Sequence, residues 1–134
     1  TVRVAGKIAR LLKGGDVVAL HGELGAGKTT FVRALARTLG VRARVTSPTF
    51  LLMRCYRVPR NLRGIRHLCH VDAYRVRSGK ALRDIGLTEY LTAPDSLTVI
   101  EWAERARDIL PRSALHIRFK YGKKPDERVI EVAR

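Results

Sequence analysis

Apolar residues in the first forty positions recur at spacings that predict a helix, a strand and a second helix. Residues 2–12 carry apolar side chains three and four positions apart, which predicts a helix that ends at Gly14-Gly15. A continuous apolar run over residues 17–20 is typical of a buried strand. Residues 29–39 form a second amphipathic segment, which ends at Gly40. This order of elements favours an α/β fold.

Further apolar segments predict more strands and several short helices in the rest of the chain. The predicted strands cover residues 50–58, 68–72, 97–100, 114–121 and 128–132, and the predicted helices cover residues 78–85, 88–91 and 103–110. The last two strands flank a turn and predict an antiparallel hairpin. We therefore expect one domain over residues 1–134, with a three-layer α/β fold, a mixed, mostly parallel sheet and a C-terminal antiparallel hairpin.

A glycine-rich loop joins the first predicted strand to the second predicted helix. Its sequence, Gly22-Glu23-Leu24-Gly25-Ala26-Gly27-Lys28-Thr29, matches the pattern G-x-x-x-x-G-K-[ST] at every fixed position. The glycines let successive backbone N–H groups point into one concavity, at the positive end of the following helix. Lys28 is placed to reach the β- and γ-phosphates, and the Thr29 hydroxyl is placed to bind Mg²⁺. The loop predicts a nucleotide-binding domain of the P-loop NTPase fold.

Two acidic residues end apolar strands, where a P-loop protein needs a carboxylate for its metal ion. Asp72 and Glu101 are both expected at the carboxyl edge of the sheet, although either one alone also fits a surface ion pair. Thr49, in a polar loop, has the hydroxyl of a switch residue that senses the γ-phosphate, and it also fits a simple turn. Trp102 fits either a wall of the nucleotide pocket or the core.

The net charge of +15 favours an acidic partner, with RNA as the first candidate. Arginine accounts for 20 of the 27 basic residues, however, and a GC-rich coding sequence also produces an arginine bias. The densest cluster consists of Arg54, Arg57, Arg60, Arg63 and Arg66. Tyr56 is the one aromatic residue among them, so no base-stacking motif accompanies the cluster. RNA binding and a purely compositional origin both stay open for this segment.

Two cysteines are too few for a disulfide framework, and a nucleotide site favours a reducing cytosol. We expect Cys55 and Cys69 to fill the core as small apolar residues. A zinc site that combines them with His67 and His70 is disfavoured, because residues 67 and 69 share one strand face and residue 70 points to the other. No apolar run is long enough to span a bilayer, and the expected location is cytoplasmic, without membrane contact.

Five segments in a fixed order resemble the TsaE (YjeE) family, the bacterial P-loop ATPases needed to make threonylcarbamoyladenosine in tRNA. They are Gly22–Phe31, Thr46–Phe50 (T-S-P-T-F), His70–Arg75 (H-V-D-A-Y-R), Asp84–Leu87 (D-I-G-L) and Ile100–Trp102 (I-E-W). Many ATPases share the phosphate loop, whereas the ordered set S-P-T, H-x-D-x-Y-R, I-G-L and I-E-W is far more specific. The resemblance extends over nearly the whole chain.

This resemblance implies ATP and Mg²⁺ as cofactors and gives individual residues a role. The residues it implies for ATP binding are Thr1, Gly22, Gly25, Ala26, Gly27, Lys28, Thr29, Thr30, Trp102, Glu104 and Arg128. Thr29 and Glu101 would bind Mg²⁺. The implied catalytic residues are Lys28, Thr49, Asp72 and Glu101.

The resemblance also implies an ATP-hydrolysing subunit that acts with the proteins TsaB and TsaD and resets their complex between turnovers. For the basic segment Arg54–Arg66 we expect a contact with the tRNA phosphate backbone inside that complex, rather than an independent RNA site, and no DNA partner is expected. A small-molecule P-loop kinase and a nucleotide-regulated RNA-binding module are the alternatives. Three departures from the family pattern occur: Glu23 where Asp is more frequent, Ala103 where Pro is frequent, and a segment 54–66 that is longer and more basic.

Overall fold

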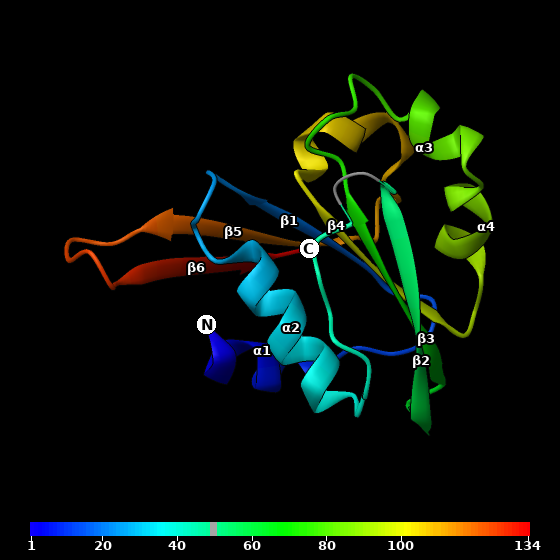
Figure 1. Cartoon of the computed structure of the whole chain (residues 1–134), viewed down its shortest axis with the longest axis horizontal. Coiled ribbons are helices and arrows are strands. Elements are labelled where there is room, and N and C mark those ends of the chain that lie inside the picture. The colour runs from blue at the N-terminus through cyan, green and yellow to red at the C-terminus, as the bar shows by residue number, and fades with distance from the viewer. Residues whose placement is uncertain (49–50) are drawn as a thin grey trace.

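A single six-stranded sheet forms the centre of the molecule (Figure 1). The computed structural model describes residues 1–48 and 51–134. In spatial order the strands are β2 (Met53–Leu62), β3 (Ile65–Asp72), β4 (Ser96–Glu101), β1 (Val17–Gly22), β5 (Leu115–Tyr121) and β6 (Arg128–Ala133). The pairs β1–β4, β1–β5 and β3–β4 are parallel, whereas β2–β3 and β5–β6 are antiparallel. The predicted mixed, mostly parallel sheet and the C-terminal hairpin are confirmed.

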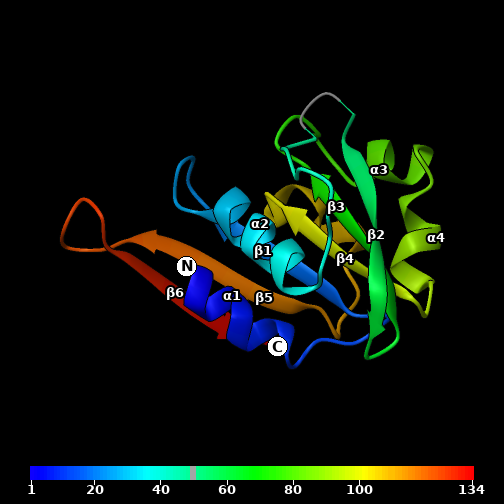
Figure 2. The same cartoon turned by 60° about the horizontal axis from the view of Figure 1, so that its bottom comes forward.

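Helices cover both faces of this sheet (Figure 2). One face packs against α1 (Val2–Ala9) and α2 (Lys28–Thr38), and the other packs against α3 (Lys80–Asp84), α4 (Leu87–Thr92) and the 3₁₀ helix η1 (Ala103–Ile109). The three predicted layers are therefore present. None of the helices in the described ranges has both the length and the apolar character needed to cross a membrane.

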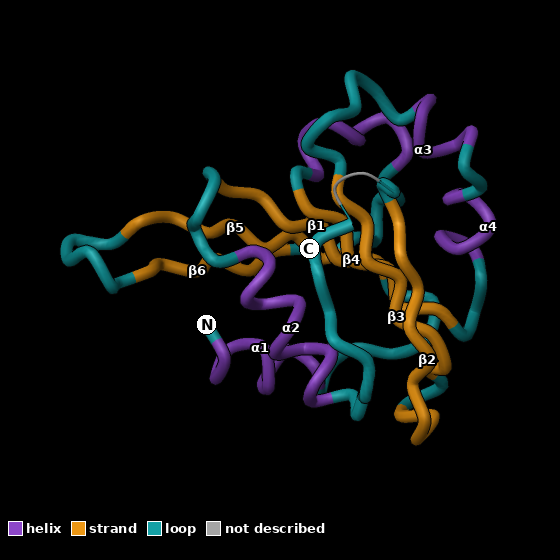
Figure 3. The backbone as a smooth tube through the Cα atoms, in the orientation of Figure 1, coloured by secondary structure: helices purple, strands orange, loops and turns teal. Residues whose placement is uncertain are grey.

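Strand β1 shows why its sequence is apolar without a break. Val18 and Leu20 belong to the core under α1 and α2, whereas Val17 and Ala19 belong to the core on the opposite face. A central parallel strand is buried on both faces, so both sets of alternating side chains are apolar. The register places Leu20 beside Glu101. The loops that follow β1, β3 and β4 therefore gather at one edge of the sheet (Figure 3).

The limits of several elements differ from those predicted. Helix α1 ends at Ala9 because the chain turns at Arg10 and Leu11, which leaves Leu11 exposed. The predicted strand 50–58 begins at Met53 and continues to Leu62, and its first residue, Phe50, lies outside the described residues. Strands β2 and β3 form a hairpin through Arg63 and Gly64, which have φ values of 51° and 79°.

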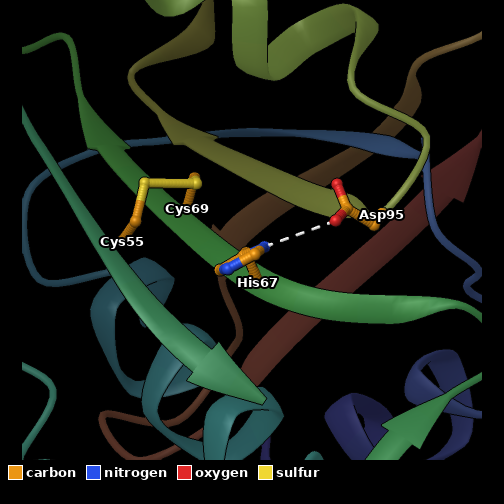
Figure 4. The surroundings of a disulfide bond; sticks show 4 residues. All are labelled: Cys55, His67, Cys69 and Asp95. Atoms are coloured by element: carbon orange, nitrogen blue, oxygen red, sulfur yellow. Dashed lines mark ion pairs between the residues drawn. A yellow bond between two sulfur atoms is a disulfide. The ribbon is translucent and has the colours of Figure 1, made fainter.

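The expectation that both cysteines fill the core is wrong. Cys55 and Cys69 lie directly opposite each other in the β2–β3 ladder, with Cα atoms 4.1 Å apart, and they form a disulfide (Figure 4). Cys69 is fully buried, but Cys55 is exposed on the edge strand β2. Directly opposed residues of an antiparallel pair place their Cβ atoms close together, and this brings the sulfurs within bonding distance. With both sulfurs in the bridge, neither thiol is free to bind zinc.

The histidines near the bridge occupy opposite faces of β3, as the alternation of strand residues predicts. His67, on the face of Cys69, has its Nδ1 3.8 Å from Asp95 Oδ2 (Figure 4). His70 is fully buried on the other face and contacts Glu101. The two histidines therefore take part in separate interactions.

Candidate functional site

The glycine-rich loop curves tightly between β1 and α2. At Gly22, φ is 145°, and a Cβ atom would lie 2.6 Å from the carbonyl oxygen of Phe119 on β5. Gly27, with φ of 113°, precedes the first residue of α2. Both backbone conformations are readily adopted by glycine only. The loop thus presents the amino end of α2 toward the same edge of the sheet where β3 and β4 end.

Lys28 is almost fully buried, with 5% of its surface exposed. Its ammonium donates hydrogen bonds to the carbonyl oxygens of Gly22 and of Glu23, the latter at 2.9 Å. The Nζ atom also lies 4.1 Å from the ring centroid of Trp102. Burial lowers the pKa of the Lys28 ammonium, and nearby carboxylates, Glu101 foremost, act in the opposite direction. The lysine is held within its own loop as a positive charge at the base of the site.

Thr29 and Glu101 meet across the gap between α2 and β4. The Thr29 hydroxyl donates a hydrogen bond of 2.9 Å to Glu101 Oε1, and Glu101 is 3% exposed. The other carboxylate oxygen, Oε2, lies 2.5 Å from His70 Nε2. A hydroxyl and a carboxylate oxygen at this spacing are the hard donors that Mg²⁺ prefers. His70 fixes the orientation of that carboxylate through the oxygen that does not contact Thr29.

Asp72 lies at the end of β3, beside Glu101 in the β3–β4 register. Its Oδ2 accepts a hydrogen bond of 2.8 Å from the Ser47 hydroxyl, and its Oδ1 accepts one of 2.9 Å from the Tyr74 backbone N–H. Asp72 is 6% exposed. The second predicted acid is therefore oriented from two sides, and the loop that carries Ser47 is held against the end of β3.

Trp102 follows Glu101 directly and has a left-handed backbone conformation, with φ of 56°. Such a conformation is uncommon for a bulky residue and is concentrated at functional sites. Its ring packs against Tyr74, with centroids 4.9 Å apart, and the Arg105 guanidinium lies 5.7 Å from it. Trp102 is half-buried and forms a wall of the site.

A cavity of about 390 Å³ brings most of these groups together. Its lining residues come from the phosphate loop, the start of α2, the loop before β2 and the ends of β3 and β4: Leu24, Gly25, Gly27, Lys28, Thr29, Thr30, Ser47, Asp72, Tyr74, Glu101 and Trp102. The side chain of Ala26 is buried in the core, and this residue is not among those that line the cavity. The cavity combines the backbone of the glycine-rich loop with the charged groups of Lys28, Asp72 and Glu101, which is the chemistry that a phosphate site with a metal ion requires.

Three residues that the family resemblance implies as outer nucleotide contacts lie around the phosphate loop, outside the lining of this cavity. Thr1 is adjacent to Gly27, since a Cβ atom there would lie 3.6 Å from the Thr1 hydroxyl. Glu104 Oε2 lies 3.2 Å from His21 Nδ1 at the end of β1. The Arg128 guanidinium lies 4.6 Å from the ring centroid of Tyr121, whose hydroxyl donates to the carbonyl oxygen of Leu24.

His21 adds a buried titratable group below the loop. Its Nε2 lies 2.9 Å from His116 Nδ1, and the two rings stack. Burial lowers the pKa of the His21 imidazole, the positive charge of Arg118 lowers it further, and the Glu104 carboxylate opposes both effects. A largely neutral His21 joins Glu104 to β5 through hydrogen bonds.

Sequence reasoning gave no site role to three residues that the structure places beside the predicted ones. His70, Ser47 and Tyr74 all lie within the motifs H-V-D-A-Y-R and T-S-P-T-F, so the motifs themselves carried the signal. Positions 70 and 72 share a strand face, which also links His70 to Asp72. Thr49 lies outside the described residues.

Comparisons with known proteins agree with this geometry. A family model described as "Threonylcarbamoyl adenosine biosynthesis protein TsaE" matches residues 1–130. The protein named tRNA threonylcarbamoyladenosine biosynthesis protein TsaE from Streptomyces coelicolor is 45% identical over 114 residues, covering 84% of this chain and 74% of that protein. Its namesake from Bacillus subtilis is 38% identical over 130 residues, which are 97% of this chain and 77% of the relative.

A solved structure extends the similarity to three dimensions. The crystal structure of YdiB from Bacillus subtilis superimposes with a TM-score of 0.71 at 34% identity, over 97% of this chain and 78% of that one. The matched family model covers both the phosphate loop and the strand ends that carry Asp72 and Glu101. The chain belongs to the TsaE family.

Proposed function

We propose that this protein is a Mg²⁺-dependent ATPase that serves the synthesis of threonylcarbamoyladenosine in tRNA. Membership of the TsaE family supports the pathway. The observation that carries the activity is the contact between the Thr29 hydroxyl and Glu101 Oε1, at 2.9 Å. This contact joins the phosphate loop to a buried carboxylate. In P-loop NTPases a hydroxyl and a carboxylate in these positions hold Mg²⁺ beside the bound triphosphate.

The donor set fits both cofactors. Thr29 and Glu101 would hold Mg²⁺ through hard oxygen atoms, and the backbone N–H groups of residues 25–30 would hold the ATP phosphates at the amino end of α2. The metal ion supplies compensation for the negative charge that develops during phosphoryl transfer. Lys28 adds a second positive charge, and the packed rings of Trp102 and Tyr74 form part of the cavity wall.

Asp72 is the residue we assign to the attacking water. Its two carboxylate oxygens are oriented by Ser47 and by the Tyr74 backbone N–H, so the group is held in the lining of the cavity beside Glu101. A fixed carboxylate there can accept a hydrogen bond from water and align it for attack. Thr49, two residues after Ser47, is the proposed sensor of the γ-phosphate.

TsaB and TsaD are the proposed partners, and resetting of their complex between turnovers is the proposed use of the hydrolysed ATP. No arginine is among the described residues that line the phosphate cavity, so slow turnover by the isolated protein is expected, with acceleration in the assembled complex. Release of inorganic phosphate from Mg-ATP, measured without any acceptor and then with TsaB and TsaD added, tests both parts. A transferred phosphate that appears only on an added small molecule would identify a kinase instead.

His70→Asn tests how the metal carboxylate is positioned. The variant removes the imidazole that contacts Glu101 Oε2, so the carboxylate loses its buried support. We expect the Mg²⁺ concentration for half-maximal phosphate release to rise by about 10-fold or more, since groups that orient metal ligands commonly have effects of this size. The matched control is His67→Asn, on the opposite face of the same strand. An unchanged Mg²⁺ dependence in His70→Asn would contradict the role.

A further inference from the structure

The acidic residues of this chain are distributed very unevenly. Residues 24–71 contain ten Lys and Arg residues and no Asp or Glu, whereas the other 86 residues contain 17 basic and all 12 acidic residues. Basic residues are therefore about equally frequent in residues 24–71 and in the rest of the chain. Acidic residues, in contrast, are absent from residues 24–71. A coding bias toward arginine does not explain this exclusion, so the positive surface of this segment needs a physical cause.

In three dimensions the acid-free segment forms α2, the connection 39–48, and strands β2 and β3. The connection leaves the end of α2 and runs between that helix and β2 toward the site edge (Figures 1 and 3). It reaches Ser47, which donates to Asp72. The segment thus has its amino end in the phosphate loop and returns to the same cavity.

A cleft of about 410 Å³ lies between the second half of α2 and this connection. Four exposed arginines line it: Arg33, Arg37, Arg42 and Arg44. We call this the arginine cleft. Within the described ranges, none of the four forms an ion pair with an acidic residue. Its floor includes the buried Ala36 and Val45, so the side chains at the rim carry all of its charge.

The spacing of these arginines brings like charges together. Arg33 and Arg37 are one helical turn apart, where like charges repel and destabilise the helix. Arg33 is further held by a hydrogen bond of 3.0 Å from its Nε to the carbonyl oxygen of Val45, which fixes its guanidinium over the connection. Positive groups placed together in this way favour an external polyanion.

The arginines of the sequence cluster 54–66 do not gather in one cleft. Arg57 and Arg66 line a different cavity together with His67, and Asp95 lies 3.8 Å from His67 on that side. Arg54 instead points back to the connection, where it donates to the Thr46 hydroxyl at 3.4 Å. The arginines of the predicted RNA segment are therefore divided among different places, whereas the four arginines of the arginine cleft share one cavity.

We infer that the arginine cleft binds the phosphodiester backbone of a structured RNA, which under the proposed function is tRNA. Guanidinium groups match phosphate oxygens in geometry and charge. The aromatic residues of the acid-free segment that are described, Phe31 and Tyr56, are buried, so the cleft has no platform for stacking single-stranded bases. The cleft therefore recognises the shape and charge of a folded RNA by contacts with the RNA backbone.

The test measures binding of a fluorescently labelled tRNA transcript to the isolated protein, without ATP, from 50 to 300 mM KCl. The variant R37E/R42E/R44E reverses three charges of the arginine cleft and leaves Arg33, which holds Val45, in place. We expect about 10-fold or greater loss of affinity at the lowest salt. The slope of log affinity against log salt should fall by about 2 to 3, as the loss of three phosphate contacts requires.

The matched control is R112E/K123E/K124E, which makes the same change in net charge at exposed positions outside the acid-free segment. It should retain most of the affinity. Equal losses in both variants would show binding by net charge alone and would overturn the inference. Full tRNA binding by the cleft variant would overturn it as well, and lost co-purification of TsaB or TsaD in that variant would then identify an acidic protein surface as the occupant.

This readout is independent of nucleotide hydrolysis. ATP affinity and circular dichroism should be the same for the cleft variant and the wild type, because the four arginines lie outside the phosphate cavity. If the protein binds tRNA through the arginine cleft but releases no phosphate from ATP, the proposed ATPase activity is refuted. The inferred RNA-binding site is then still supported.

Discussion

Lys28→Ala is expected to weaken ATP binding by about 100-fold or more, to the limit of detection in a calorimetric titration. Lys28 supplies the single lysine charge among the residues that line the phosphate cavity, and the triphosphate carries its charge into the same space. The ammonium is already desolvated by burial, so little further dehydration opposes its contact with phosphate. Loss of this charge therefore removes attraction that the backbone N–H groups alone do not replace.

The control for this experiment is Lys124→Ala, an exposed lysine in the β5–β6 turn, which should bind ATP as the wild type does. Lys28→Arg is a useful second variant, because it keeps the charge but replaces the compact ammonium beside Trp102 with a broader, planar guanidinium. Wild-type ATP affinity in a folded Lys28→Ala protein would refute the assignment of the phosphate loop.

Glu101→Ala is expected to reduce phosphate release at saturating Mg-ATP by about 1000-fold, the scale seen when a main electrostatic contact of a transition state is removed. Glu101 is buried between Thr29 and His70, and its two oxygens contact one of them each. Under the proposed function, removal of the carboxylate would leave Mg²⁺ with the Thr29 hydroxyl as its remaining protein donor in this pair. ATP itself should still bind through the phosphate loop.

Because Glu101 is buried, Glu101→Gln accompanies the alanine variant and preserves its shape. Circular dichroism and thermal unfolding show whether each variant is folded. Asp95→Asn, which alters a half-buried acid beside His67, is the matched carboxylate control and should hydrolyse ATP normally. Near-normal turnover by a folded Glu101→Gln protein would mean that Asp72 or another acid holds the metal.

The parts of the fold that the sequence predicts well are those with local causes. The strand 17–20, the glycine-rich loop and helix α2 are adjacent in sequence, and each has its own signal, so their positions agree with the structure. The acids Asp72 and Glu101 were predictable because the ends of parallel strands lie at one edge of a sheet. Their convergence needed no knowledge of side-chain packing.

Features that depend on register were not predictable in the same way. Whether Cys55 faces Cys69 depends on how 14 residues of hairpin are paired, and a shift of one residue would have placed the two sulfurs on opposite faces. The contact of His70 with Glu101 similarly needs the exact pairing of β3 with β4. A single sequence determines the faces of each strand but leaves these pairings open.

The position of Trp102 has a spectroscopic consequence. It is the single tryptophan of the chain, so all indole emission originates at the wall of the proposed nucleotide site. Its ring lies 4.1 Å from the Lys28 ammonium, which must leave the carbonyl oxygens of its own loop to reach bound phosphates. Entry of a nucleotide thus changes the charge next to the fluorophore. The native protein, without any label, contains an optical probe of its own binding step, and the kinetics of nucleotide entry are accessible in a stopped-flow fluorimeter.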